Sequence, residues 1–292
     1  MEKAILKTLI YADIFDYPLT VFEIHKWLIG KKVTLRQVEK ALSKLVQSAK
    51  CKVQSGYYFL PRRDGLVVKR KRRDEQSEKY LRKARILTQI LKLIPWIKLV
   101  GISGGLAMNN ADKGDDIDLF IITSKNRLWI SRFLALGLLS LTGQRRKVGY
   151  EGGKIAGKVC INTLLEEDRL DQKNKDIYLA HEVLQMRVLW QRDGIYGKYL
   201  EDNAWVFNFL PNWIGDARSP ATVSLRGASH RATKQSILKT MEGIAKKFQL
   251  WYMKEPTGQE RIEDGALYFH PHDMRSQALA EFRKKVKSLI SP

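Results

Sequence analysis

The sequence predicts an α+β protein built around a mixed sheet. Two observations lead to this class. Between residues 96 and 168, apolar runs of strand length alternate with turn residues and with one apolar helical run. Before and after that segment, apolar residues recur mainly at helical spacing. We therefore expect an N-terminal domain over 1–73, a basic connecting helix over 74–95, a mixed α/β core over 96–168 and a helical C-terminal region over 169–292 with a mobile loop near 215–232.

Length and charge set the frame for these parts. The chain has 292 residues, enough for two or three compact units, and its apolar content of 44% is ordinary for a globular protein. Its 52 basic and 31 acidic residues give a formal net charge of +21. Such a field attracts polyanions, including nucleic acid, nucleotides and anionic membrane surfaces. A merely soluble, basic surface is the alternative interpretation.

The first 60 residues predict three helices and a hairpin. Apolar residues from Lys3 to Phe15 have helical spacing, Thr20 can cap a second helix that ends at Leu28, and Thr34 can cap a third. Residues 51–60 then alternate as a short hairpin would. This order resembles a winged helix-turn-helix domain, which implies a third helix that reads DNA. Winged helices also serve as protein interfaces and docking modules, and both uses stay open.

A dense run of positive charge follows the hairpin. Phosphate contacts from such a run give salt-dependent, sequence-independent affinity, so we interpret it as a candidate surface for RNA or DNA. A solvated helix face whose charges have no partner is the alternative. The residues of this basic run are Arg62, Arg63, Lys69, Arg70, Lys71, Arg72 and Arg73.

The core segment carries the most informative pattern of the chain. A strand over 97–102 leads into the turn Ser103-Gly104-Gly105, and ten residues later an apolar strand contains Asp116 and Asp118. Glycines let a ligand approach the backbone closely, and a following helix start offers free N–H groups to phosphate. Two aspartates at positions i and i+2 of a strand share one side. Buried together they are costly without solvent, a cation or a metal, which predicts a phosphate and metal site.

These residues resemble the signature of the nucleotidyltransferase superfamily typified by DNA polymerase beta. Gly104-Gly105 and the apolar-flanked Asp116-Ile117-Asp118 occupy the places of its motif. The resemblance implies that Asp116 and Asp118 bind Mg²⁺ or Mn²⁺. It also implies that Ser103, Gly104 and Gly105 hold a nucleoside triphosphate, which we expect to be ATP. The nucleoside monophosphate would pass to a hydroxyl of RNA, a protein or a small molecule, with release of pyrophosphate.

The family's third carboxylate is missing at its expected place. In the strand predicted over 158–165, the residue in that setting is Asn162, which offers a carbonyl oxygen but no charge and no base. Glu166, Glu151 and Glu167 are looser candidates for the role. We take Asp116, Asp118 and Asn162 as the candidate catalytic set. A catalytically weak nucleotide-binding regulator with a DNA- or protein-binding winged helix is the alternative function.

Beyond the core, the pattern from Asp171 to Tyr199 predicts one helix, and further helices are expected from about Thr233 and from Ser276 to Ile290. His181-Glu182 begins like a zinc-protease motif, but Gln185 stands where the second histidine is needed, so His181 is expected to be a packed residue. The His270–Asp273 cluster has no second group of ligands, which makes a turn the better interpretation than a metal site.

Cellular location is predicted from three features. The two cysteines, Cys51 and Cys160, make no disulfide framework. The N-terminus runs directly into an amphipathic helix and has no signal-peptide pattern. The run from Leu128 to Leu141 contains Arg132 and is too short to span a bilayer, so we interpret it as a core helix behind the sheet. We expect a cytoplasmic protein with no membrane partner, and the oligomeric state is left open.

Overall fold

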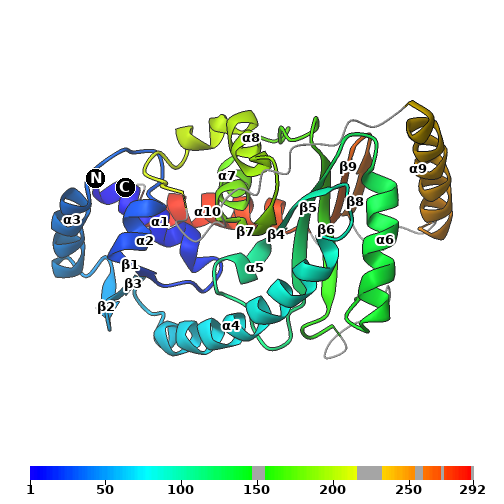
Figure 1. The fold of residues 1–292 in the computed structure, drawn as a ribbon. Coiled ribbons are helices and arrows are strands. Elements are labelled where there is room, and N and C mark those ends of the chain that lie inside the picture. Colours follow the sequence, from blue (N-terminus) through cyan, green and yellow to red (C-terminus); the bar gives the residue numbers. More distant parts are fainter. Residues whose placement is uncertain (147–154, 216–231, 254–258, 271–272, 291–292) are drawn as a thin grey trace.

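A computed structural model describes residues 1–146, 155–215, 232–253, 259–270 and 273–290 (Figure 1). The mixture of helices with a mixed sheet confirms the expected α+β class. The loop predicted near 215–232 falls almost wholly outside the described residues, as do Glu151 and His272.

The N-terminal domain contains the expected three helices and hairpin. Its helices are α1 (Glu2–Asp13), α2 (Val21–Lys26) and α3 (Leu35–Gln47), and its strands β1 (Leu19–Thr20), β2 (Lys52–Gln54) and β3 (Tyr57–Phe59) form a sheet in the order β1-β3-β2. Both predicted caps are confirmed, because Thr20 and Thr34 accept from the backbone N–H three residues on, in complete capping boxes. Apolar faces of the three helices meet in a core that includes Ile5, Ile10, Ile24, Leu28, Val38, Leu42 and Leu45.

A long helix, α4 (Leu66–Leu91), joins this domain to the rest of the chain. It begins eight residues before the predicted connecting helix, after Gly65, whose φ of 89° closes the preceding turn. Arg70 of α4 is buried, with its guanidinium 3.6 Å from the centre of the Tyr17 ring and 2.8 Å from the Glu23 carboxylate. The first turns of α4 are therefore part of the N-terminal domain's packing.

Most of the basic run has acidic partners within the chain. Arg63 and Lys69 pair with Asp16, and Arg63 also pairs with Asp13. Arg72 and Arg73 both pair with Asp112, at the edge of the core. With Arg70, five of the seven residues are thus in ion pairs, whereas Arg62 and Lys71 are exposed. These ion pairs mainly hold the start of α4 against neighbouring segments. Fewer of the positive side chains are therefore available to bind phosphate.

The central sheet has six strands in the order β7-β4-β5-β6-β9-β8 (Figure 1). Strands β5 and β6 are parallel, and the other neighbours are antiparallel. Three strands come from the core segment and three from the region after it. Their bounds are β4 (Ile97–Ile102), β5 (Ile117–Thr123), β6 (Val159–Glu166), β7 (Arg187–Gln191), β8 (Gln259–Glu263) and β9 (Ala266–His270).

The single helix predicted over 171–199 is wrong. The chain instead forms α7 (Ile177–Gln185), strand β7 and α8 (Ile195–Asp202). Val188, Leu189 and Trp190 favour an extended conformation, and pairing with the open edge of β4 supplies the hydrogen bonds that settle it. The region after residue 168 is therefore less purely helical than expected, because it completes both edges of the sheet.

Helices cover both faces of the sheet. One face packs against α4 and α6 (Leu128–Leu141), which confirms the expected core helix at 128–141, and α9 (Ala232–Tyr252) lies against α6. The opposite face packs against α7, α8 and the short helix Ala204–Asn208, together with side chains from the N-terminal domain. Helix α10 (Met274–Ile290) lies against α1 and α7. Along β5, Leu119 and Ile121 face α6 whereas Phe120 and Ile122 face α7, so Asp118 shares the α7 side.

Helix α9 contacts α6 through polar groups as well as apolar ones. The Glu242 carboxylate accepts from the backbone N–H groups of Trp129 and Ile130 at 2.7 and 3.0 Å. The apolar stripe that predicted this helix is largely exposed, as Ile244 and Trp251 show with exposed fractions of 62% and 60%. Among the described residues, no helix is long and apolar enough to cross a membrane.

Candidate functional site

The predicted glycine turn lies directly against the aspartate strand. Strand β4 ends at Ile102, and the Ser103 N–H donates to the backbone carbonyl of Asp118 at 3.1 Å. Gly104 begins the four-residue helix α5 (Gly104–Ala107) with a φ of 63°. A Cβ atom at Gly104 would lie 3.2 Å from Oδ2 of Asp118. Glycine is therefore favoured there both by the backbone conformation and by the closeness of the carboxylate.

The carboxylates of the two predicted aspartates lie close together. Asp118 is the second residue of β5 and Asp116 directly precedes the strand. Their carboxylate oxygens and the Cys160 sulfur of β6 all lie within 4.8 Å of one another. Arg146, at the end of the described segment that follows α6, donates to Oδ2 of Asp116 at 2.7 Å. The structure thus brings together the pair that the sequence predicted and adds one cation.

The charge on Asp118 has little compensation from the protein. Burial first, and the nearby charge of Asp116 second, raise the pKa of Asp118 well above its usual value, against a smaller opposing effect of Arg146. Arg146 bonds to Asp116 and not to Asp118. Without another cation the site therefore favours a proton on Asp118, and a bound metal ion would replace that proton.

Asn162 lies at an irregularity of the parallel β5–β6 pair. Leu119 is opposite Ile161 and Phe120 is opposite Thr163, so Asn162 is an extra residue in β6. Asn162 and Thr163 consequently both line the same cavity. Oδ1 of Asn162 and Oγ of Ser103 are buried and have no hydrogen-bond partner among the described residues. Buried oxygens without partners are uncommon in folded proteins, and two of them here indicate a place for a ligand.

Two of the looser candidates for a third carboxylate have other roles. Glu166 accepts from the backbone N–H groups of Arg127 and Leu128, where α6 begins. Glu167 pairs with Lys98 at 2.6 Å. Neither residue lines the cavity beside the aspartates. Asn162, by contrast, does line that cavity.

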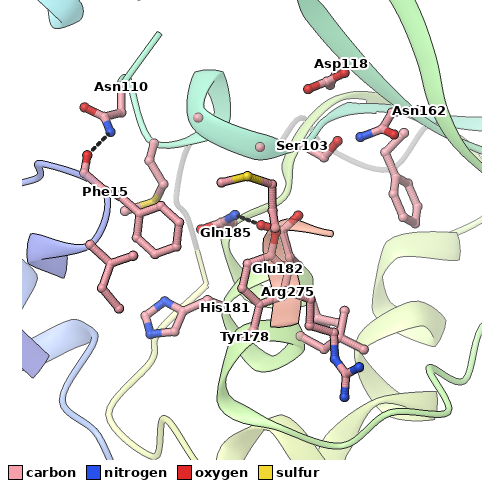
Figure 2. A pocket seen from close by; sticks show the side chains of 18 of the residues that line it. Phe15, Ser103, Asn110, Asp118, Asn162, Tyr178, His181, Glu182, Gln185 and Arg275 are labelled. Carbon is pink, nitrogen blue, oxygen red and sulfur yellow. Dashed lines mark hydrogen bonds between the residues drawn. The ribbon is translucent and has the colours of Figure 1, made fainter. Parts of the chain in front are cut away.

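A cavity of about 700 Å³ opens beside the aspartates. It is lined by the Ser103–Gly105 turn, by β5 and β6, by α7 and α10, and by α1 of the N-terminal domain. Figure 2 shows Asp118, Asn162 and Ser103 on one side of it, with Phe15, His181 and Tyr178 on other walls. The volume lies within the range of small-molecule sites. The N-terminal domain thus contributes directly to the wall of this site.

Helix α7 places a carboxylate in the cavity that sequence reasoning missed. Glu182 lines the cavity with Tyr178 and Gln185, and Gln185 Nε2 donates to its carboxylate at 2.5 Å (Figure 2). Burial raises the pKa of Glu182 to about 7, although the Gln185 hydrogen bond opposes the shift. A signal was present, because positions 178, 182 and 185 form a polar stripe at helical spacing on an otherwise apolar helix.

His181 is a packed residue, as expected. Its ring stacks on Tyr11 at 4.2 Å and on Trp27 at 5.1 Å between ring centres. Burial lowers the pKa of His181 to about 3, so the ring is neutral at physiological pH. His181 therefore links α7 to the N-terminal domain and holds the helix that carries Glu182.

The donor atoms at the aspartate pair fit a hard divalent cation. Asp116 and Asp118 offer carboxylate oxygens, which Mg²⁺ and Mn²⁺ prefer. Burial raises the pKa of the Cys160 thiol to about 12, so this group stays protonated and is a poor ligand for such ions. Within the described ranges, Asp116, Asp118 and Cys160 form the one group of three or more His, Cys, Asp or Glu side chains close enough to share a metal ion.

Comparisons of the chain with protein-family models, with curated proteins and with solved structures found no significant match. The function proposed below therefore rests on the geometry of this site and on the motif that its residues resemble.

Proposed function

We propose that the protein is a metal-dependent nucleotidyltransferase. It would move a nucleoside monophosphate from a nucleoside triphosphate, which we take to be ATP, to a hydroxyl acceptor and release pyrophosphate. The observation that carries this proposal is the closeness of the Gly104 turn to Asp118, at the wall of a cavity with the volume of a small-molecule site. The reaction needs a backbone segment that phosphate can approach and a pair of carboxylates that can bind a metal ion.

The residues around the turn would bind the triphosphate. The Ser103 hydroxyl is buried without a partner, and Gly104 and Gly105 have no side chains to keep phosphate oxygens from the backbone. Asp116 and Asp118 would hold Mg²⁺ or Mn²⁺. Bound there, the metal would neutralise phosphate charge and polarise the phosphoryl group that is transferred. Arg146, already paired with Asp116, would add a positive charge on the same side.

The reaction is an in-line displacement at the α-phosphorus. The acceptor oxygen forms a new P–O bond, and the bond from that phosphorus to the bridging oxygen of the β-phosphate breaks. Pyrophosphate leaves with the bonding electrons, and the acceptor hydroxyl loses its proton. Asn162 can orient a ligand through its amide, but it cannot take that proton. The protein's main contributions are position and charge stabilisation.

The volume of the cavity favours a small acceptor or a flexible chain end. Its lining comes from helices and strands on several sides, and a nucleic-acid duplex would not fit in about 700 Å³. Five of the seven residues in the basic run already have acidic partners, which weakens the case for RNA or DNA as the acceptor. A small molecule or a protein side chain remains the better candidate.

A second candidate function is nucleotide binding without turnover. Asn162 favours this second candidate, because the nucleotidyltransferase motif that the sequence resembles has a carboxylate where this chain has an amide. In that case the N-terminal domain would bind DNA or a partner protein under nucleotide control. The exposed polar face of α3, which includes Arg36, Lys40 and Lys44, is compatible with either partner.

The direct test is transfer of label from α-labelled ATP with Mg²⁺ or Mn²⁺. Separate reactions would contain cellular RNA, cellular protein and the low-molecular-mass fraction of a cell extract. Label that appears in one fraction and is lost in an Asp116→Ala/Asp118→Ala variant would support the transferase and identify the acceptor class. Nucleotide binding that depends on the aspartates, without movement of label or release of pyrophosphate, would favour the second candidate.

A further inference from the structure

The acceptor's proton needs a destination that Asn162 cannot provide. Glu166 and Glu167, the nearby carboxylates of β6 and the turn after it, are engaged at the start of α6 and with Lys98. A base for this reaction must line the cavity, accept a proton at neutral pH and lie on the side of the sheet that Asp118 faces.

Glu182 meets these conditions. It extends from α7, on the sheet face that Asp118 shares with Phe120. In Figure 2 its carboxylate points toward the side of the cavity that carries Ser103, Asn162 and Asp118. The charge of Glu182 is also one of the smaller contributions to the raised pKa of Asp118.

The surroundings of Glu182 preserve its ability to take a proton. Gln185 is its hydrogen-bond partner, and this amide fixes one carboxylate oxygen without giving the group a permanent positive partner. The titratable groups that sense its charge are Tyr11 on α1, Tyr178 on α7, Tyr199 on α8 and Asp118 on β5. Arg275 of α10, which lines the same cavity, pairs with Asp176 at 2.5 Å.

We propose that Glu182 is the general base of the transferase and accepts the proton of the acceptor hydroxyl. This inference rests on the proposed function. As the acceptor oxygen bonds to the α-phosphorus and pyrophosphate leaves, the hydroxyl proton moves to the Glu182 carboxylate, which later releases it to solvent. Glu182 replaces, from a helix, the carboxylate that the strand lacks at Asn162.

The test compares Glu182→Gln with the unaltered chain in the ATP-label assay, using Mn²⁺ and the acceptor fraction that takes label. General-base catalysis is typically worth about 10²- to 10⁴-fold, so we expect kcat to fall by that order. The Kd for Mn²⁺–ATP, measured by calorimetry, should stay within about threefold because Glu182 does not hold the triphosphate. The kcat of the unaltered chain should fall as the pH drops below about 7, because Glu182 becomes protonated. The residual kcat of Glu182→Gln should lack this acid limb, the decrease toward low pH.

A matched control is Glu167→Gln, which removes a carboxylate that lies outside the cavity lining. It should keep both kcat and the pH profile. Glu182→Asp, which retains a shortened carboxylate, should keep part of the rate and the acid limb.

The outcomes separate this inference from the proposed function. If the unaltered chain moves no label to any acceptor, both fail. If it moves label but Glu182→Gln retains the rate, or if kcat of the unaltered chain is flat from pH 5 to 9, only the assignment of Glu182 is overturned. If Glu182→Gln does not fold, the pH profile of the unaltered chain decides alone.

Discussion

Gly104 and Asp118 approach so closely that a Cβ atom on the glycine would lie 3.2 Å from the carboxylate oxygen Oδ2. The contact joins the end of β4 to the start of β5, and it is supported by the hydrogen bond from the Ser103 N–H to the Asp118 carbonyl. The turn at Gly104 thus places its own backbone and the Asp118 carboxylate side by side at the wall of the cavity.

Substitution of Gly104 by alanine should damage both stability and metal binding. A φ of 63° is unfavourable for alanine, and the new methyl group would press on the Asp118 carboxylate. We expect a loss of about 1–3 kcal/mol in the free energy of unfolding, measured by denaturant titration, and weaker Mn²⁺ binding. Gly114→Ala is the control, because a Cβ there meets nothing within 4 Å. Equal effects of the two substitutions would contradict this account.

Asp118→Asn should stabilise the metal-free protein near neutral pH while removing its response to metal. The raised pKa means that ionised Asp118 is less favourable in the folded than in the unfolded state, so its stability cost appears as pH rises above about 3.8 and is absent at lower pH. Thermal unfolding from pH 3 to 8 measures the gain in stability, and addition of Mn²⁺ should raise the Tm of the unaltered chain but not that of Asp118→Asn. Asp171→Asn, at an exposed carboxylate, serves as the control and should change neither quantity. A Mn²⁺-dependent rise that survives in Asp118→Asn would place the metal elsewhere.

The stability of the protein should also depend on Glu182 in a defined pH window. Its pKa is about 7 in the folded protein against 4.5 as the ordinary value, so protonated Glu182 fits the fold and ionisation costs stability. Glu182→Gln should match the unaltered chain below about pH 4.5. It should then become more stable, by up to about 3 kcal/mol, as pH rises through 7. Denaturant unfolding at a series of pH values tests this, and a constant difference across the range would be the contrary result.

Arg73 should matter for stability more than for nucleic-acid binding. Its guanidinium bonds to Asp112 at 2.8 Å, to the Phe15 carbonyl and to Asn110, and it joins α4 both to the N-terminal domain and to the core. We expect Arg73→Gln to lower the free energy of unfolding by about 1–3 kcal/mol. Lys71→Gln, at an exposed position of the same helix, should change it by less than about 0.5 kcal/mol. Fluorescence anisotropy with a labelled RNA completes the comparison: a large loss of affinity in both variants, without loss of stability, would restore the basic run as a nucleic-acid surface.

Much of the fold could be predicted where short-range signals decide it. Thr20 and Thr34 cap their helices through residues three positions away, and the apolar run at 128–141 becomes a helix with those same bounds. The aspartate pair was predictable for the same reason, because its spacing and its apolar neighbours are local. The glycine turn and Asn162 likewise followed from patterns within single segments.

The features that were missed depend on contacts between distant segments. Residues 187–191 form a strand because β4 offers an open edge, and this partner is about 90 residues earlier in the chain. Glu182 enters the site only because α7 packs on the same sheet face as Asp118. The partners of Arg63, Lys69 and Arg73 are acidic residues distant in the sequence, so the basic run looked unpaired in the sequence. Neither hydrophobic periodicity nor motif spacing records such pairings.

The most direct test of the central claim is a crystal structure of the protein with Mn²⁺ and a non-hydrolysable ATP analogue, with the metal located by anomalous scattering. The account predicts a peak bonded to the carboxylates of Asp116 and Asp118, with the triphosphate against Ser103, Gly104 and Gly105. An analogue bound away from this turn, or no metal at the two aspartates when the analogue is bound, would contradict it.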